Sequence, residues 1–317
     1  MSCEIILSQD HDGRRLDRTI RSIWPALPLS AVMRALRKGE ARLDGVRAHS
    51  GDIRVTGGAR LYVPWEEPGG EAYEQKAKTS NTRAVPIIWR GENTLVIDKP
   101  AGLLVQPDVK HGDSVITRVW GMFGAGEQGF SPAAVHRLDR NTTGALLVAM
   151  SGGALRELER IFRERLISKR YIAVVVGDLP KSGLIDAPLL KDETTGVVRV
   201  DSYGLTAKTR YERLDTIRVQ DFVFSIASID LLTGRTHQAR VHLAHIGHPI
   251  LGDGKYGRPE TNRRMKKEVK RPLLHAYELA FPKNLTGDLT EVSGQVFRSE
   301  IPLDMKKFMP DSTKANG

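Results

Sequence analysis

The sequence predicts an α+β protein in which strands outnumber helices. Its larger part, residues 85–310, holds five apolar, strand-like runs but only two segments with the 3.6-residue apolar period of an amphipathic helix. These strands and helices do not alternate regularly, as they would around a wound parallel sheet. Because 40% of the 317 residues are hydrophobic, the chain is long enough to bury one large core or two unequal ones.

The elements of this main domain can be placed approximately. One helix is expected from Ser151, a residue type that caps helices, to Ile167, and the other around Gln238 to Ile246. The strand-like runs are Thr94 to Asp98, Ala145 to Met150, Tyr171 to Val176, Phe222 to Leu232 and Glu291 to Phe297.

A separate small domain is expected at residues 1–64. Apolar residues recur at helical spacing behind Asp12 and again behind Ser30, a suitable N-cap. Two short apolar pieces follow, at 41–43 and 60–63, with Asp44-Gly45 as a turn between possible strands. Residues 65–84 are polar, glycine-rich and aperiodic, which indicates a linker, and residues 311–317 are expected to form a disordered tail.

The small domain is strongly basic. Between residues 11 and 64, eleven arginines and lysines stand against five acidic residues, which is +6 of the chain's net +10. Such an excess favours a polyanionic partner, either nucleic acid or an acidic membrane surface, although an ordinary solvated helix face is the alternative. Helical spacing puts two basic sets on one face each, which favours a phosphate-binding surface. The sets are Arg14, Arg18 and Arg21, and Arg34, Arg37 and Lys38.

Several functional classes are disfavoured by what the sequence lacks. Cys3 is the only cysteine, which excludes an intrachain disulfide and a cysteine-ligated zinc site. The first residues carry no basic flank or sustained apolar run, and no stretch approaches about 18 apolar residues, so we expect a cytoplasmic protein without a signal peptide or membrane span. The glycine-rich segment 124–129 formally matches GxGxxG but lacks the flanking strand and helix of a dinucleotide site.

A cluster of histidines invites a metal interpretation. His242 and His245 are spaced to meet on one helix face, between His237 and His248. No carboxylate or cysteine lies in register to complete a shell, so we expect no metal. The basic run 261–271 is either a mobile solvated loop or a second contact for the polyanionic partner.

Three segments carry residues suited to chemistry. His136-Arg137-Leu138-Asp139 precedes a buried strand, which places the Asp139 carboxylate near a sheet end beside two arginines. Tyr171 enters the next strand and is either a core residue or a platform for a flat ligand. Residues 232–243 form a strand-to-helix turn with donors able to hold phosphate or a carboxylate. Taken singly, each segment has an ordinary structural explanation.

Together the three segments resemble the RluA-type family of pseudouridine synthases. The family pattern H-R-L-D-x-x-T-S-G, then K-x-Y-x-A, then G-R-T-H-Q-I-R-V-H-L and G-H-P-I-x-G-D-x-x-Y-G occurs here in the same order, across nearly all of residues 85–282. The departures are small: Thr143 stands for the usual serine and Ala239 for the usual isoleucine. The small domain is similar to an S4 RNA-binding domain. The resemblance implies a mixed, largely antiparallel central sheet with flanking helices.

The resemblance also implies roles for particular residues. The catalytic aspartate falls on Asp139, the active-site tyrosine on Tyr171, and the basic partner of the aspartate on Arg240. Arg137 matches the arginine that helps hold the site open around an extruded nucleotide, and Leu274 matches an apolar residue that packs the site. Further expected RNA contacts are Arg235, His237, Arg14, Arg18, Arg34, Arg37 and Lys38.

The implied activity is isomerisation of uridines in RNA, most often in large-subunit ribosomal RNA, without a cofactor, nucleotide or metal. The sequence does not show the oligomeric state, and a monomer is the default expectation. Asp139 acts either as a nucleophile toward sugar or base, or as the base that starts glycosidic cleavage. The alternatives from other classes are a non-catalytic RNA-binding or ribosome-assembly factor, and a metal-dependent hydrolase that uses the histidines.

Overall fold

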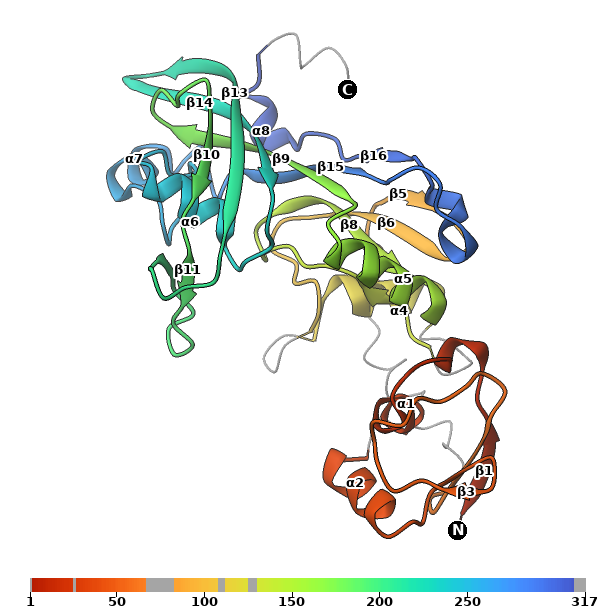
Figure 1. The fold of residues 1–317 in the computed structure, drawn as a ribbon. Coiled ribbons are helices and arrows are strands. Elements are labelled where there is room, and N and C mark those ends of the chain that lie inside the picture. Colours follow the sequence, from red (N-terminus) through yellow and green to blue (C-terminus); the bar gives the residue numbers. More distant parts are fainter. Residues whose placement is uncertain (1, 25–26, 67–82, 108–111, 125–129, 311–317) are drawn as a thin grey trace.

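The computed structural model describes residues 2–24, 27–66, 83–107, 112–124 and 130–310. Most of the segment expected as a linker, all but the first residue of the GxGxxG segment, and the tail 311–317 lie outside the described residues. Figure 1 shows a smaller N-terminal unit and a larger C-terminal part built around one long, curved sheet.

The N-terminal unit packs an antiparallel sheet of strand order β1-β4-β2-β3 against helices. Leu16 and Ile20 of one helix and Leu36 of the other are fully buried in a common core. Trp65 packs against the same core beside Trp24. The elements are β1 (Cys3–Ile6), η1 (Gln9–His11), α1 (Leu16–Ile23), α2 (Leu29–Arg37), β2 (Arg42–Leu43), β3 (Val46–Arg47) and β4 (Arg60–Val63).

Two local predictions in this unit are wrong. The N-cap of α2 is Pro28 rather than Ser30. Pro28 has the extended backbone conformation of an N-cap residue (φ −67°, ψ 147°), and proline has no N–H that would need a partner at the start of the helix. Arg14 precedes α1, and its carbonyl accepts a hydrogen bond from Val55 N. Arg14 therefore does not share a helix face with Arg18.

The larger part is organised by a ten-stranded mixed sheet. Eight strands follow the order β10-β13-β14-β9-β15-β8-β6-β5, with β16 on β15 and β7 on β8. Every pair is antiparallel except β15–β8, so the expected mixed, largely antiparallel sheet is confirmed. The strands are β5 (Ile87–Arg90), β6 (Thr94–Lys99), β7 (Ala133–Ala134), β8 (Thr143–Ala149), β9 (Ser168–Val176), β10 (Ser182–Asp186), β13 (Lys208–Val219), β14 (Phe222–Leu231), β15 (Leu274–Ala280) and β16 (Val296–Arg298).

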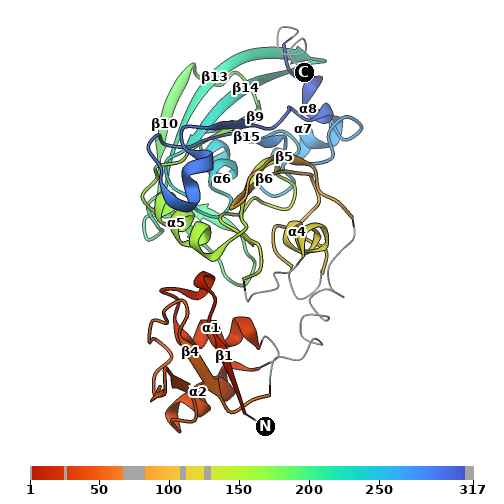
Figure 2. The same ribbon diagram turned by 90° about the vertical axis from the view of Figure 1, so that its right-hand side faces the viewer.

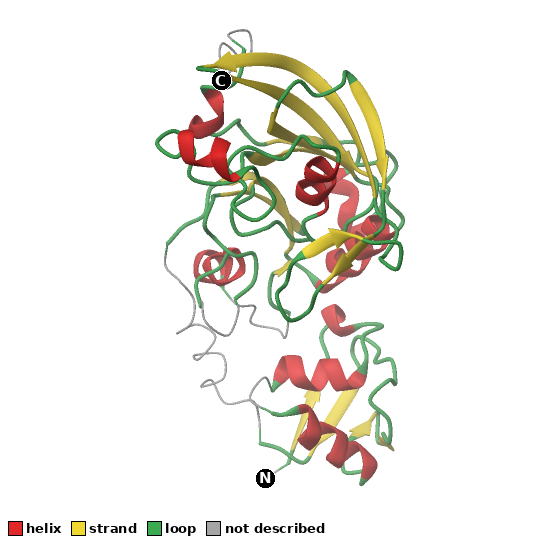
Figure 3. Cartoon of the chain, turned by 90° about the vertical axis from the view of Figure 1, so that its left-hand side faces the viewer, coloured by secondary structure: helices red, strands yellow, loops and turns green. Residues whose placement is uncertain are grey.

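Helices cover both faces of this sheet. On β8, Leu146 and Val148 point into the core that holds α4 (Val115–Phe123) and α6 (Gln238–His245), while Leu147 points to the core beneath α5 (Gly152–Arg163). This alternation is the period-2 pattern of a strand buried on both faces. Figure 3 shows the helices distributed around the curved sheet. The remaining elements are the hairpin β11 (Leu189–Lys191) and β12 (Val198–Val200), α7 (Pro259–Arg264), η2 (Gly287–Val292) and α8 (Leu303–Lys306).

Two expected elements of the larger part differ in extent. The helix after Ser151 ends at Arg163, because Arg165 adopts a positive φ of 60° before the chain enters β9. The expected strand from Glu291 to Phe297 is instead the end of η2, a turn at Gly294 (φ 70°) and the short β16. Glu291 accepts hydrogen bonds from the backbone of the turn before β6, which holds this segment in its turn.

The N-terminal unit contacts the larger part at the start of α5. Gly152 N donates to Asp10 Oδ1 at 2.9 Å, and Arg156 Nη1 donates to the Asp10 carbonyl at 3.2 Å. Figures 1 and 2 both show η1 of the unit beside α5. Among the described residues, no helix has the length and apolar character needed to cross a bilayer.

Candidate active site

Buried side chains and a backbone hydrogen bond fix the loop that carries Asp139. Leu138 packs into the core of the sheet, and Thr142 N donates to the Asp139 carbonyl at 3.0 Å. Gly144 follows at a φ of 110°, where a Cβ would lie 2.2 Å from the Ala276 carbonyl of β15. Only glycine permits this approach, and β8 therefore meets β15 directly behind the loop.

Lys99, the last residue of β6, ties the same loop together. It is completely buried, and its ammonium donates to the carbonyls of Pro100, Arg140 and Thr142 at 2.9 Å each. Burial lowers the pKa of Lys99 to about 7, an effect that the nearby Asp139 carboxylate opposes. Two of these acceptors, the carbonyls of Arg140 and Thr142, lie on either side of Asn141, so Lys99 helps to fix the backbone directly after Asp139.

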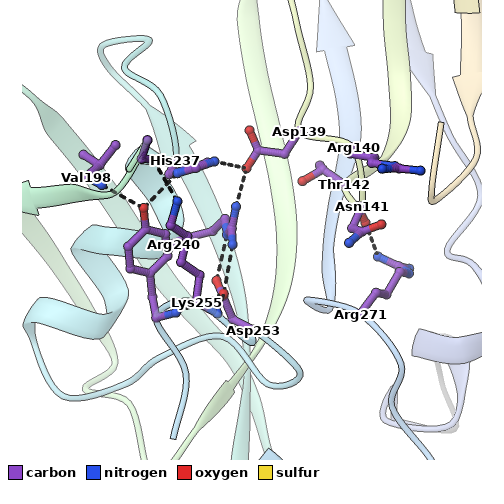
Figure 4. A network of polar contacts seen from close by, with 12 residues as sticks. Asp139, Arg140, Asn141, Thr142, Val198, His237, Arg240, Asp253, Lys255 and Arg271 are labelled. Atoms are coloured by element: carbon purple, nitrogen blue, oxygen red, sulfur yellow. Dashed lines mark hydrogen bonds and ion pairs between the residues drawn. The ribbon is translucent and has the colours of Figure 1, made fainter. Parts of the chain in front are cut away.

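Asp139 forms an ion pair with Arg240 of α6, as Figure 4 shows. Arg240 Nη1 lies 3.0 Å from Asp139 Oδ2, while its Nε and Nη2 donate to Asp253 at 2.7 and 2.9 Å. The Asp253 side chain is 0% exposed and also accepts backbone N–H bonds from Lys255 and Tyr256. Asp253 thus orients the guanidinium group of Arg240 so that its remaining nitrogen, Nη1, faces Asp139.

The charges of Arg240 and Asp253 stabilise each other. Burial alone would lower the pKa of Arg240, but hydrogen bonds and charge from Asp253 and Asp139 raise it above its usual value. Burial likewise opposes ionisation of Asp253, and the bond to Arg240 outweighs it and lowers the pKa of that carboxyl. Arg240 therefore remains cationic throughout the physiological range.

His237 flanks Asp139 on the other side. It precedes α6 in a left-handed conformation (φ 53°), and its Nε2 lies 3.9 Å from Asp139 Oδ2. Its Nδ1 lies 2.8 Å from the Tyr256 hydroxyl, which accepts a hydrogen bond from Val198 N. Burial lowers the pKa of His237, against the charge of Asp139, so the imidazole is neutral at pH 7. When the tyrosine donates to Nδ1, the ring proton is on Nε2 and faces Asp139.

Tyr171 closes the site from β9. Its side chain is 7% exposed, and it packs in the same hollow as Asp139 and Leu274. Burial raises the pKa of Tyr171, and the Asp139 carboxylate raises it further, so the phenol keeps its proton at neutral pH. Within the described residues its hydroxyl makes no hydrogen bond, which leaves it available to a bound molecule.

Three connected hollows meet at Asp139. The largest, about 880 Å³, extends along the end of α5 and the strands β9, β13 and β14, and a second of about 700 Å³ extends toward Leu104 and Pro272. A small hollow of about 70 Å³ is lined by Tyr171 and shares Arg137, Asp139 and His237 with the other two. We call the three together the cleft. Arg137 is exposed and lines all three.

The structure brings the seven expected site residues of the larger part to the small hollow: Arg137, Asp139, Tyr171, Arg235, His237, Arg240 and Leu274. The five expected in the N-terminal unit are in none of the three hollows. Arg18, Arg34, Arg37 and Lys38 are exposed on α1, α2 and the C-cap of α2. Arg14 is partly buried, and burial together with Arg156 lowers its pKa.

Sequence reasoning missed Lys99, Asp253 and Tyr256. Asp253 stands in the Gly252-Asp253-Gly254 stretch of the family pattern, and a carboxylate so placed after Arg240 is a usable signal for a buried partner. Nothing in the local sequence distinguishes Lys99 from an exposed lysine, because two of its three acceptors, the carbonyls of Arg140 and Thr142, come from a loop about 40 residues away.

The histidines and the basic run have other partners in the structure. His242 bonds to Thr209 Oγ1 and the Ala187 carbonyl, and His248 bonds to the Val176 carbonyl. In the described part of the chain, no three His, Cys, Asp or Glu side chains gather as a metal shell would require. The run 261–271 continues from α7, and Met265, Val269 and Arg271 are buried, the last against Asp304.

Comparison with known proteins gives a consistent result. The model of the family described as RNA pseudouridylate synthase matches residues 93–245. The ribosomal large subunit pseudouridine synthase C of Vibrio cholerae is 33% identical over 87% of this chain and 88% of its own length. The protein of the same name in Escherichia coli K12 is 32% identical over 95% and 92%.

Solved structures share the fold. Human RNA Pseudouridylate Synthase Domain Containing 4 superposes with a TM-score of 0.55 at 24% identity, covering 75% of this chain and 99% of its own. Human RNA Pseudouridylate Synthase Domain Containing 1 gives a TM-score of 0.53 at 24% identity, covering 75% and 96%.

Proposed function

The chain belongs to the RNA pseudouridylate synthase family, and we propose that it isomerises uridines of large-subunit ribosomal RNA with Asp139 as the catalytic carboxylate. The substrate class is supported by the relatives named ribosomal large subunit pseudouridine synthase C, which align with most of the chain. The observation that carries the catalytic assignment is the ion pair of Asp139 with Arg240 in the cleft, beside Tyr171.

The reaction exchanges one bond of the base for another. The bond from ribose C1′ to uracil N1 breaks, the base turns, and a bond from C1′ to C5 forms while C5 loses its proton and N1 gains one. No electron donor or phosphoryl group is consumed. The target base must leave its stack to enter the site, which costs a few kcal/mol.

Four residues of the cleft have a role in this proposal. Asp139 Oδ1 is free to face the substrate because Arg240 engages Oδ2. Arg240 stabilises the carboxylate as an anion and holds its direction. Tyr171 stacks on the extruded uracil, and its protonated hydroxyl donates a hydrogen bond. The exposed Arg137 stands at the mouth of the cleft, where it contacts the RNA around the vacated position.

The N-terminal unit is proposed to bind RNA in the manner of an S4 domain. Four cations, Arg18, Arg34, Arg37 and Lys38, are exposed on or at the end of its two helices. Exposed cations contribute sequence-independent affinity for a phosphate backbone. We further propose a monomer in the cytoplasm, which fits the single cysteine and the bacterial relatives.

Release of tritium from RNA labelled at uridine C5 tests this function, because isomerisation frees that hydrogen. We expect release with the wild-type protein, and none above background with Asp139→Asn. The variant should retain RNA affinity, since asparagine keeps the shape of the side chain. Rapid release by Asp139→Asn would contradict the catalytic assignment. Binding of ribosomal RNA without any release by the wild type would favour a non-catalytic RNA-binding factor.

A further inference from the structure

Helix α5 reaches from the N-terminal unit to the cleft. Its first residue, Gly152, lies against Asp10 of the unit so closely that a Cβ would stand 2.3 Å from the Asp10 carbonyl. Its last residue, Arg163, lines the largest hollow of the cleft together with Asp139. One helix therefore contacts both the N-terminal unit, through Asp10, and the cleft that holds Asp139.

The arginines of α5 are not used alike. Arg160 is neutralised by Glu157 and Glu164 of the same helix. Arg156 and Arg163 form no ion pair with the described residues, and both are exposed. They are seven residues apart, so they lie on one face of the helix about 10 Å apart. Arg156 also acts on Arg14 of the N-terminal unit, where it helps to lower the pKa.

The positive surface continues beyond the helix into the cleft. Arg165 and Arg210 line the same hollow, are exposed, and form no ion pair within the described chain. The hollow contains only two carboxylates among its lining residues, Asp139 and Asp230. Leu166, which is 45% exposed, lies among these cations and offers an apolar contact for bases. Cations interleaved with apolar groups suit a nucleic-acid strand.

The other basic surface of the larger part lacks this geometry. The cations of α7 and of the residues after it are absent from the lining of all three hollows. Arg264 there is engaged by Asp221 and Glu260. Lys266 and Lys267 are exposed and line none of the three hollows, and Figure 1 shows the preceding helix α7 away from the N-terminal unit.

We propose that the exposed face of α5 and the adjoining cleft form a track for the RNA backbone from the N-terminal unit to Asp139. We call it the α5 track; its residues are Arg156, Arg163, Arg165 and Arg210. It binds phosphates of the strand that flanks the target uridine. The inference rests on the proposed function, because it takes RNA as the substrate.

The test is RNA affinity as a function of salt, measured on the full chain with a transcript of large-subunit ribosomal RNA. The double variant Arg163→Gln, Arg165→Gln removes two track cations, and Lys266→Gln, Lys267→Gln removes the same charge from the α7 surface. For the track variant we expect at least tenfold weaker binding near 0.1 M salt, and a plot of log affinity against log salt that is shallower by about 1.5. The α7 control should bind as the wild type does.

Wild-type affinity and slope in the track variant would overturn the track, as would an equal loss in the α7 control. Both results are obtained without turnover, so they are separate from the proposed function. A chain that releases no tritium but shows the expected loss in the track variant keeps the track and overturns the catalysis. If the wild type releases tritium while the track variant binds RNA as the wild type does, the proposed catalysis is kept and the track is overturned.

Discussion

The arginine in the cleft and the cations of the N-terminal unit differ in what surrounds them. Arg240 is 11% exposed and is engaged by two carboxylates, one of which is fully buried. In the N-terminal unit, Arg18, Arg34 and Arg37 are exposed and form no ion pair with the described residues. Lys38 meets a carboxylate there, Glu40 at 3.7 Å, and both side chains are largely in solvent.

This contrast separates two uses of positive charge in one chain. A buried, paired arginine has one orientation, and its charge stabilises and directs a specific carboxylate. The side chains of exposed and mostly unpaired cations can adopt many orientations. They bind phosphates with little loss of their own hydration, and so contribute affinity. We therefore expect changes in the cleft to affect stability and chemistry, and changes in the N-terminal unit to affect binding and its salt dependence.

The largest effect is expected for Arg240→Met. The change leaves the buried Asp253 without its partner, which costs about 3–5 kcal/mol of folding free energy. Tritium release should also disappear, because Asp139 loses its partner. The double variant Arg240→Met, Asp253→Leu removes both buried charges and should regain part of the stability, because Lys255 N and Tyr256 N still lose their acceptor, but no activity. Chemical denaturation and tritium release check this, and recovery of activity in the double variant would show that Arg240 is only structural.

A smaller effect is expected when the four exposed cations of the N-terminal unit are replaced by glutamine. The log–log salt slope of RNA binding should fall by about 3. Folding stability should change little, because single exposed charges contribute little to it. The rate of tritium release should be reduced at low RNA concentration and should return to the wild-type rate as the RNA concentration is raised. An unchanged salt slope in filter binding would remove the RNA-binding role of this unit.

The smallest effect concerns acid stability of the larger part. His275 is completely buried between Thr143 Oγ1 and the Ser299 carbonyl, and burial lowers its pKa to about 4. Between pH 6.5 and 4 the imidazole is protonated in the unfolded chain but not in the folded chain. The free energy of unfolding therefore decreases as the pH falls. His275 alone contributes roughly 2 kcal/mol to the loss of stability from pH 7 to 5.

Unfolding by urea at both pH values measures this loss. His275→Asn should be less stable at pH 7 but lose less on acidification. An identical loss in the variant would mean that other groups cause it.

An element could be predicted from the sequence where neighbouring residues determine it, and could not where contacts with distant residues determine it. The strands β6, β8, β9 and β14 were placed to within a few residues, because their apolar runs are bounded by polar residues on the chain itself. The strand expected at Glu291–Phe297 was wrong, because Glu291 bonds to a turn almost 200 residues away.

The same distinction applies to the site. Asp139, Tyr171 and Arg240 were singled out by pattern, and the structure places them around one hollow. Lys99 acts by burial against a loop about 40 residues away, which has no local sequence signature, whereas Asp253 lies within the family pattern and could have been singled out from it. The sequence also does not reveal that Arg14 leaves the helix face of Arg18.

The central claim is that the chemistry resides in Asp139 and the affinity in exposed cations. The direct measurement is a single-turnover assay of tritium release at saturating RNA, made in parallel with RNA affinity, for Asp139→Asn and for the variant lacking the four cations. We expect Asp139→Asn to bind normally and release nothing, and the four-cation variant to bind weakly and release tritium once saturated. Substantial release by Asp139→Asn, or full affinity without the four cations, would contradict the account.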